Sequence, residues 1–236
     1  MKISVIIPAL NEETRIVSTL EQVGGFLEQH DINAEIITVD DGSTDATEFV
    51  SHETLRRRHT PYKVIRHKTN AGKGAAIATG IKHSTGDYIL FLDADGSTNI
   101  KELKRFFTYI NPATLLIGSR QKNKNLILID QGYGRKILGF FTQLFHKIFF
   151  RLPVLDSQCG FKLLPKSLAI SFIRKPYPKR FGFDIALIDY ALKCGFEVEE
   201  IGVEWKDISG SNVRPFVDIF KTAFELLIYK INSLKQ

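Results

Sequence analysis

The chain has 236 residues, of which 44% are hydrophobic and 25% are charged, a composition that excludes a disordered, collagen-like or coiled-coil protein. Lys and Arg outnumber Asp and Glu by 32 to 26, and residues 120–182 hold 13 of these basic residues but only 2 of the acidic ones. We call residues 120–182 the basic segment; such a concentration argues against a nucleic-acid coat, which would spread its charge.

The cysteines and the N-terminus bear on the compartment of the protein. Cys159 and Cys194 lie far apart, and neither belongs to a CxxC pattern with companion histidines, so we expect no disulfide framework and no zinc site. The first residues predict a strand rather than a signal peptide, and no window reaches about 18 uninterrupted apolar residues. We therefore expect a reduced, cytoplasmic setting and no segment that spans a membrane by itself.

Short apolar runs alternate with amphipathic segments through the first half of the chain. Strands are predicted at 3–8, 35–39, 63–66, 88–92 and 114–118, and helices at 12–29, 45–58, 73–83 and 99–110. This alternation, with its short connections, predicts an α/β fold with a doubly wound, mostly parallel sheet. Ligands bind such sheets beyond the carboxyl ends of the strands, so we expect the chemistry at that edge.

Polar residues follow the first two predicted strands at this edge. Pro8–Glu12 ends the first strand. Asp40 and Asp41 end the second, where their carboxylates are placed to accept hydrogen bonds from a base N–H or from ribose hydroxyls. Ser43 or Thr44 is expected to cap the helix that follows.

Two glycines flank Lys73 at the start of the third predicted helix. The segment does not meet the pattern GxxxxGK[ST], because Gly74 stands where Ser or Thr belongs, and GxGxxG is absent after the first strand. A P-loop NTPase and a dinucleotide-dependent dehydrogenase are therefore disfavoured. Lys73 remains available to a phosphate that approaches the start of the helix.

Two carboxylates one residue apart, Asp93 and Asp95, follow the most apolar predicted strand. Ionised carboxylates are costly to bury unless something pairs with them. A hard divalent ion such as Mg²⁺ or Mn²⁺ takes oxygen ligands and leaves positions for substrate phosphates. We favour a metal site here over the alternative that these acids only cap the helix near Asn99.

Residues 91–97 also resemble the first motif of the haloacid-dehalogenase phosphatases, with Asp184 and Asp189 as candidates for the acidic pair of that fold. That motif normally lies on the first strand of its fold. Here 90 residues of α/β pattern come before it, so a phosphatase is the less favoured interpretation.

The pattern changes after Arg120. Amphipathic helices are predicted at 134–151 and 216–231, with a strand at 158–164, a helix at 183–194 and a strand at 198–205 between them. No repeat or linker separates the two halves, so we expect a single domain over residues 1–236.

The predicted helix 134–151 places phenylalanines such as Phe141 and Phe145 on one face, with cations beside them. Such a helix lies readily in a membrane interface, where anionic headgroups attract its basic residues. The alternative is that these rings belong to the core or to a dimer interface. We expect peripheral contact with an anionic membrane.

Asp156 is one of two acidic residues in the basic segment. It has two interpretations: it pairs with a neighbour such as Arg151 or Lys162, or it works as an ionised base or orienting group whose pKa the surrounding cations keep low.

Six motifs occur in order along the chain. They are Val-Ile-Ile-Pro-Ala-Leu-Asn-Glu (5–12), Val-Asp-Asp-Gly-Ser-Thr-Asp (39–45), Asn-Ala-Gly-Lys-Gly-Ala-Ala (70–76), Asp-Ala-Asp-Gly (93–96), Gly-Ser-Arg (118–120) and Asp-Ser-Gln-Cys-Gly-Phe-Lys (156–162). Together they resemble the family 2 glycosyltransferases, and within that family the dolichyl-phosphate β-glucosyltransferases and other polyprenyl-phosphate enzymes. The resemblance implies a Rossmann-like GT-A fold with C-terminal amphipathic helices, and inverting, metal-dependent transfer from a nucleotide sugar to a lipid phosphate.

The resemblance also implies roles for individual residues. It puts Asp93 and Asp95 at a divalent metal and Asp156 near the reacting anomeric carbon. Contacts with the nucleotide sugar are expected for Pro8, Leu10, Glu12, Asp40, Asp41, Lys73, Asp93 and Arg120, and contacts with the acceptor or a phosphate for Arg135, Lys162, Ser211 and Arg214. Asn212 stands where the family often has lysine, so Arg214 is expected to supply that charge.

We therefore expect residues 1–120 to form the half that binds the nucleotide sugar and metal, and residues 121–236 to face the acceptor and the membrane. UDP-glucose is the favoured donor and a polyprenyl or dolichyl phosphate the favoured acceptor, at the cytoplasmic face of a membrane and without nucleic acid. The alternatives are transfer to a saccharide hydroxyl in polysaccharide or glycolipid synthesis, an inactive membrane-surface scaffold, and a phosphatase. A homodimer or a separate membrane-protein partner is also compatible with the sequence.

Overall fold

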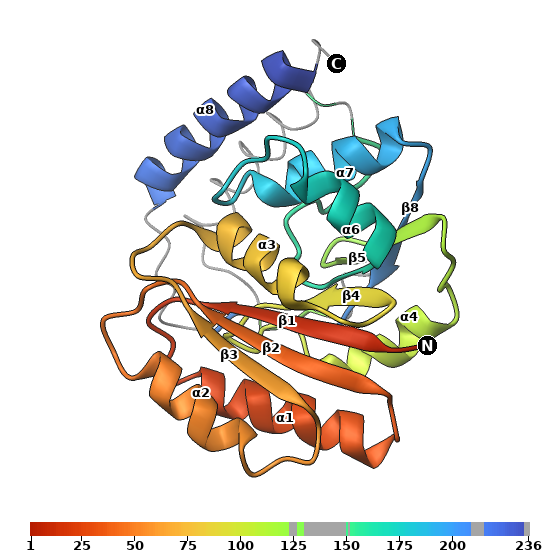
Figure 1. Ribbon diagram of the computed structural model, residues 1–236. Helices are drawn as coiled ribbons and strands as arrows, with labels where there is room; N and C mark the ends of the chain where they lie inside the picture. The colour runs from red at the N-terminus through yellow and green to blue at the C-terminus, as the bar shows by residue number, and fades with distance from the viewer. Residues whose placement is uncertain (123–126, 130–149, 151, 209–214, 234–236) are drawn as a thin grey trace.

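A computed structural model describes residues 1–122, 127–129, 150, 152–208 and 215–233 (Figure 1). The predicted helix 134–151, Arg135 within it, and both Ser211 and Arg214 lie outside the described residues, apart from Phe150. Phe150 is buried against the core.

A seven-stranded sheet forms the centre of the molecule, in the order β3-β2-β1-β4-β7-β5-β8. Its strands are β1 (Ile3–Ala9), β2 (Ala34–Asp40), β3 (Tyr62–Arg66), β4 (Tyr88–Phe91), β5 (Thr114–Ser119), β7 (Lys162–Pro165) and β8 (Glu197–Gly202). β7 runs antiparallel to both of its neighbours, β4 and β5, and every other pair is parallel. The predicted doubly wound, mostly parallel sheet is confirmed.

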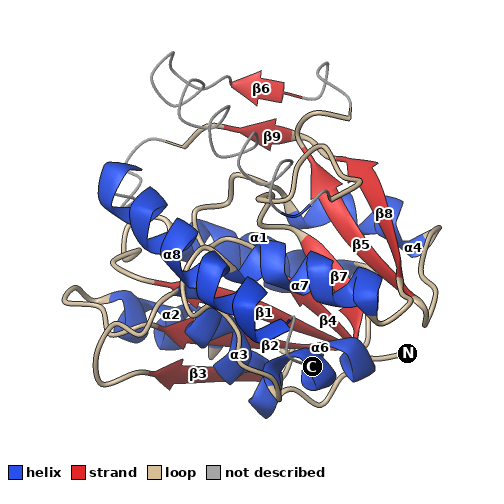
Figure 2. Cartoon of the chain, turned by 90° about the horizontal axis from the view of Figure 1, so that it is seen from above, coloured by secondary structure: helices blue, strands red, loops and turns tan. Residues whose placement is uncertain are grey.

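Helices cover both faces of this sheet (Figure 2). One face carries α1 (Ile16–Gln29), α2 (Thr47–Leu55), the 3₁₀ helix η1 (Ile100–Glu102) and α4 (Leu103–Phe107); the other carries α3 (Lys73–His83), α6 (Lys166–Ile173), α7 (Phe183–Lys193) and α8 (Pro215–Ser233). Alternate side chains of a strand point to opposite faces, so Val5 packs in the first layer and Ile6 in the second.

The main differences from the predictions concern two strands and two helices. The strand expected over 158–164 begins at Lys162, because residues 157–158 form a turn and Gly160 a bend. The strand expected over 198–205 ends at Gly202, and β9 (Trp205–Lys206) pairs separately with β6 (Ile127–Ile129). The helix expected over 99–110 divides into η1 and α4, and α6 was not predicted.

Candidate functional site

The loop after β4 carries Asp93 and Asp95. Asn99 caps η1 itself, because its Oδ1 accepts a hydrogen bond from the backbone N–H of Lys101 at 2.9 Å. The alternative that the two acids serve only as helix caps therefore loses its basis. Asp95 Oδ1 accepts from the N–H of Ser97 at 2.9 Å, which fixes the turn that holds both carboxylates.

Opposite charges alternate through the core of the site. Lys73 Nζ, at the first residue of α3, lies 2.8 Å from Asp93 Oδ1 and 3.8 Å from Asp184 Oδ2. Asp184 Oδ1 in turn lies 2.6 Å from Lys162 Nζ, and both side chains of this pair are almost fully buried. The row Asp93, Lys73, Asp184 and Lys162 thus connects β4, α3, α7 and β7. Asp184 entered the sequence reasoning only through the phosphatase motif.

The pKa values of the two carboxylates in the β4 loop are shifted in opposite directions. Burial opposes ionisation of Asp93, but the ammonium of Lys73 outweighs it and holds the pKa of Asp93 below its ordinary value. Burial and the negative charge of Asp93 raise the pKa of Asp95. Because the negative charge of Asp93 raises the proton affinity of Asp95, a cation beside the two carboxylates is stabilised.

Gly160 is a site residue that the sequence reasoning did not single out. A Cβ atom at this position would lie 1.9 Å from Asp93 Oδ2, so only glycine lets the turn before β7 pass against the carboxylate. A glycine inside a predicted strand was the available signal, because such glycines often mark a close backbone approach.

Asp156 is buried and makes a bidentate pair with Arg120, which follows β5. Arg120 Nε and Nη2 donate to its two oxygens at 2.7 and 2.8 Å, and the backbone N–H of Arg120 donates at 2.9 Å. The guanidinium also lies 5.6 Å from the ring of Trp205. Burial opposes ionisation of Asp156, yet Arg120 lowers its pKa. Asp156 therefore pairs with Arg120. Of the two neighbours suggested from the sequence, Lys162 pairs with Asp184 instead, and Arg151 lies outside the described residues.

The two acids after β2 accept hydrogen bonds from the chain itself. Asp41 accepts from the N–H groups of Ala71 and Gly72 at 2.9 and 2.7 Å, and His67 Nδ1 lies 2.8 Å from its Oδ1. Asp40 is fully buried and accepts from the N–H of Ser43 at 2.9 Å. Both carboxylates shape this turn, and contact of either with a nucleoside stays a prediction.

The cap of α2 also differs from the expectation. Asp45 Oδ1 accepts from the N–H of Thr47 at 3.0 Å, whereas Ser43 Oγ accepts from the N–H of Asn11 and the N–H of Thr44 donates to Asn11 Oδ1. The prediction that Ser43 or Thr44 caps the helix was wrong, because both tie this turn to the end of β1.

Glu12 lies beside the acids of the β4 loop. Arg15 donates to both of its oxygens at 2.6 and 2.7 Å. Burial raises the pKa of Glu12 to about 7, against the effect of Arg15 and with the help of Asp95. Pro8 and Leu10, which precede it at the end of β1, are partly exposed.

The donor set fits a hard divalent cation. In the part of the chain that the structure describes, no group of three or more His, Cys, Asp or Glu side chains gathers to hold a metal. Mg²⁺ is typically bound through one or two carboxylates together with substrate phosphates and water. Asp93 and Asp95 supply that number of carboxylates.

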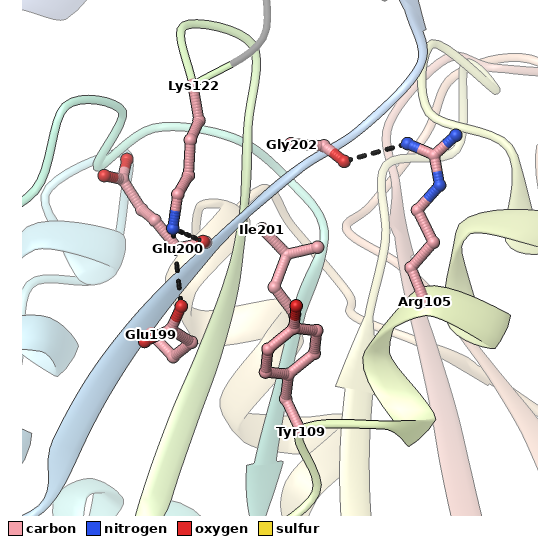
Figure 3. Close-up of a pocket in the computed structure, with 7 residues that line it drawn as sticks. All are labelled: Arg105, Tyr109, Lys122, Glu199, Glu200, Ile201 and Gly202. Carbon is pink, nitrogen blue, oxygen red and sulfur yellow. Dashed lines mark hydrogen bonds and ion pairs between the residues drawn. The ribbon is translucent and has the colours of Figure 1, made fainter.

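A separate surface cavity of about 290 Å³ lies beside β8 (Figure 3). Its lining consists of Arg105, Tyr109, Lys122, Glu199, Glu200, Ile201 and Gly202. Lys122 Nζ lies 3.3 Å from Glu199 Oε1, and Arg105 Nη1 donates to the carbonyl oxygen of Gly202 at 3.1 Å. Lys122 and Arg105 thus both have partners within the protein. None of the acids at the carboxyl ends of β1, β2 and β4 lines this cavity.

The family model described as glycosyl transferase family 2 matches residues 4–162. That match covers β1 to the first residue of β7, and with it Asp156 and the acids at the carboxyl ends of β1, β2 and β4, whereas Asp184, Glu199 and Glu200 lie beyond it. The chain belongs to glycosyl transferase family 2.

Curated relatives of this glycosyltransferase extend the similarity over nearly the whole chain. It is 33% identical to the dolichyl-phosphate β-glucosyltransferase ALG5D of Trichomonas vaginalis, over 98% of this chain and 74% of that protein. It is 31% identical to the dolichyl-phosphate β-glucosyltransferase of Saccharomyces cerevisiae, over 98% of this chain and 75% of that protein. The phosphatase interpretation is thereby set aside.

Solved structures confirm the GT-A fold. Glucosyl-3-phosphoglycerate synthase from Mycobacterium tuberculosis, in complex with Mn²⁺, UDP and phosphoglyceric acid, superposes with a TM-score of 0.68 at 19% identity, over 98% of this chain and 77% of that one. Mannosyl-3-phosphoglycerate synthase from Rubrobacter xylanophilus superposes with a TM-score of 0.72 at 15% identity, over 100% and 74%.

Proposed function

We propose that this glycosyltransferase transfers a glucosyl group from UDP-glucose to dolichyl phosphate or another polyprenyl phosphate, with inversion at the anomeric carbon. The names of the relatives at 31–33% identity support the sugar and the lipid acceptor. UDP in the Mycobacterium tuberculosis complexes supports the nucleotide.

The state of Asp156 carries the proposal. A sugar hydroxyl must lose a proton as it attacks, so it needs a base. The pKa of Asp156 lies below its ordinary value, and both of its oxygens accept from Arg120, which makes this carboxylate a poor base. A phosphate monoester, with a second pKa of about 6, is already ionised at neutral pH. Asp156 therefore orients the acceptor side of the site, and a phosphate acceptor is favoured over a saccharide hydroxyl.

Asp93 and Asp95 are the residues that would hold Mg²⁺ or Mn²⁺. Such an ion neutralises the charge that builds up on the leaving diphosphate. Lys73 adds a second positive charge at the same place, since its ammonium lies against Asp93 at the start of α3. Lys162 and Asp184 stabilise the pair of Lys73 and Asp93, because Asp184 lies 3.8 Å from Lys73 Nζ and Lys162 compensates the buried charge of Asp184.

An acceptor assay tests this function. The protein is incubated with UDP-glucose, Mn²⁺ and either a short polyprenyl phosphate or a panel of saccharides, and glucosylated product is measured. We expect lipid-linked glucose only with the phosphate. Product on a saccharide with none on the phosphate favours the second candidate, a polysaccharide or glycolipid synthase. No product with any donor, and no thermal stabilisation by UDP with Mn²⁺, contradicts both.

The acceptor implies a membrane surface, and α8 supplies a candidate contact. No helix among the described residues has the length and apolarity of a membrane span. However, α8 exposes Phe220, Phe224, Leu227 and Ile231, whose exposed fractions run from 47% to 76%. This spacing forms one stripe on the helix, while Leu226 and Tyr229 on the other side are buried. We assign the stripe to the interface of an anionic bilayer at the cytoplasmic face.

α8 also packs beside the site, which supports the proposal that a lipid phosphate reaches Lys73. Glu225 accepts a hydrogen bond from the N–H of Arg180 at 3.2 Å, and a Cβ atom at Gly72 would lie 2.5 Å from the carbonyl oxygen of Lys179. The loop at residues 178–182 thus contacts both α8 and the residue that precedes Lys73.

Flotation with vesicles tests the membrane contact. Phe224→Asp puts a charge into the stripe, so we expect it to abolish co-flotation with vesicles that contain phosphatidylserine. Phe49→Asp is the matched control, since Phe49 is 67% exposed on α2, at the opposite end of the molecule from α8 (Figure 1). Equal flotation of both variants with the unmodified protein contradicts the contact.

A further inference from the structure

Glu200, on β8, holds the backbone of the loop that carries Asp156. Its Oε1 accepts a hydrogen bond from the N–H of Asp156 at 2.7 Å, and both of its oxygens lie 3.0 Å from the N–H of Leu155. A carboxylate that accepts from two successive backbone N–H groups makes charge-assisted hydrogen bonds, which are stronger than neutral ones. Residues 155–156 are therefore fixed to the sheet.

The sheet register sets Glu200 and Arg120 close together. β5 and β8 are parallel, with Ile117 opposite Glu200 and Ser119 opposite Gly202, and Arg120 is the next residue after β5. Asp156 is thus held by residues from two neighbouring strands: Arg120, after β5, binds its carboxylate, and Glu200, on β8, accepts from its N–H.

Lys122 reinforces this strand pair. Its ammonium donates to the carbonyl oxygen of Glu200 and lies 3.3 Å from Glu199 Oε1. Figure 3 shows that the carboxylate of Glu200 points away from the side chains of Ile201 and Tyr109. The side chain of Glu200 is thereby left to the Asp156 loop.

We propose that Glu200 is a positioning residue of the transfer reaction, which fixes Asp156 and with it the acceptor side of the site. This inference rests on the function proposed above. Positioning matters because a displacement of about 1 Å at a reacting group costs on the order of 100-fold in rate. We expect Glu200 to act through Asp156, since Asp93 and Asp95, the residues proposed to hold the metal, follow β4, which lies on the other side of β7 from β5 and β8.

The experiment compares Glu200→Ala, Glu200→Gln and the matched control Glu199→Ala in the full chain. Glu199 is the adjacent residue on β8, its side chain is 45% exposed, and among the described residues its ion pair is with the surface Lys122. For each variant we measure kcat, KM for UDP-glucose, KM for a short polyprenyl phosphate, and the thermal shift produced by UDP with Mn²⁺.

We expect Glu200→Ala to lower kcat by about 10- to 100-fold, with KM for UDP-glucose and the thermal shift unchanged. Glu200→Gln retains most of kcat, because its amide oxygen still accepts from the N–H of Asp156. Glu199→Ala matches the unmodified protein. A role in stability alone predicts instead a lower Tm with normal kcat per folded molecule.

Normal kcat for Glu200→Ala, or a rise in KM for UDP-glucose that accounts for the whole loss, overturns the inference. If the alanine variant does not fold, Glu200→Asp decides, since it keeps the charge but withdraws it from the loop; an unchanged kcat then overturns the inference. An unmodified protein that transfers no glucose contradicts the proposed function as well, whereas an active protein with an unimpaired Glu200→Ala overturns only the role of Glu200.

Discussion

Asp40 and Asp41, at the end of β2, and Asp93, after β4, lie at the same edge of the sheet but have different partners. Asp41 accepts from two backbone N–H groups and lies 2.8 Å from His67 Nδ1, and Asp40 accepts from another N–H group and lies 3.6 Å from Arg66 Nε. Asp93 instead faces the ammonium of Lys73. Backbone N–H groups cannot leave a folded turn, whereas an ammonium on a four-carbon chain is able to exchange a carboxylate for a phosphate. The first region is thus held by fixed donors of the chain, whereas the second faces a cation that, in the function proposed above, supplies charge to the substrate.

The largest effect is expected for Asp93→Asn. This change removes a charge from the proposed metal position while it keeps the size of the side chain. We expect kcat to fall by about 10²- to 10³-fold, the usual cost of removing one group that stabilises the transition state. Thermal stabilisation by UDP with Mn²⁺ is expected to disappear as well. A variant with near-normal activity would show that Asp93, like Asp41, serves only the shape of its loop.

Glu35 extends the comparison to an acid at the opposite end of β2, remote from the site. Ser4 Oγ donates to it at 2.7 Å, and the backbone N–H of Thr85 also donates. Burial opposes its ionisation, but these donors outweigh burial and lower its pKa from 4.5 to about 2. Since the pKa is lower in the folded state, the ionised form stabilises the fold above pH 4.5 and this contribution is lost as the pH falls towards 2.

Glu35→Gln is therefore expected to lower the free energy of unfolding at pH 7 by on the order of 3 kcal/mol. The difference from the unmodified protein should shrink between pH 4.5 and pH 2, which urea titrations at several pH values measure. Activity per folded molecule stays normal. A difference that is independent of pH would contradict the assigned pKa.

Gly160→Ala tests the second region without changing any charge. The added methyl group would lie 1.9 Å from Asp93 Oδ2, so the carboxylate or the turn must move. We expect kcat to fall by about 10- to 100-fold. The control is Gly25→Ala in α1, where the new Cβ meets only Arg58 Nη1, at 3.8 Å. That change is expected to stabilise the helix by about 0.5–1 kcal/mol and to leave kcat unchanged. Similar kinetics for both variants would contradict the packing of Gly160 on Asp93.

These cases also show what sequence patterns were able to predict. Five parallel strands were predicted from short runs of β-branched and apolar residues; the run of β1 is almost fully buried, whereas that of β3, at the edge of the sheet, is only partly buried. The antiparallel insertion of β7 between β4 and β5 was not predicted, because that order depends on contacts between residues 88–91 and 162–165. Local pattern contains no information on such distant pairs.

The residues of the candidate site were likewise predicted only where the signal lies in neighbouring residues of the sequence. Asp93 and Asp95 were found as a pair because both follow one apolar strand. Arg120 was not predicted as the partner of Asp156, because it is 36 residues away in sequence, whereas the neighbouring Lys162 that the sequence suggested pairs with Asp184. Glu200 was missed for the same reason: an acid on a partly exposed strand is the ordinary surface pattern, and only the fold brings it to the N–H of Asp156.

The smallest effect is expected for Asp41→Asn, which tests the first region. The amide would turn an N–H group towards the N–H of Ala71 or Gly72, so one hydrogen bond is lost. Such a loss costs about 1–3 kcal/mol of stability when the donor is left buried. Urea unfolding should show this decrease, while KM for UDP-glucose changes less than about threefold, because the remaining bond keeps the turn in place. The opposite result, normal stability with a large rise in that KM, would mean that Asp41 exchanges its backbone partners for the nucleoside, and the difference between the two regions would then no longer hold.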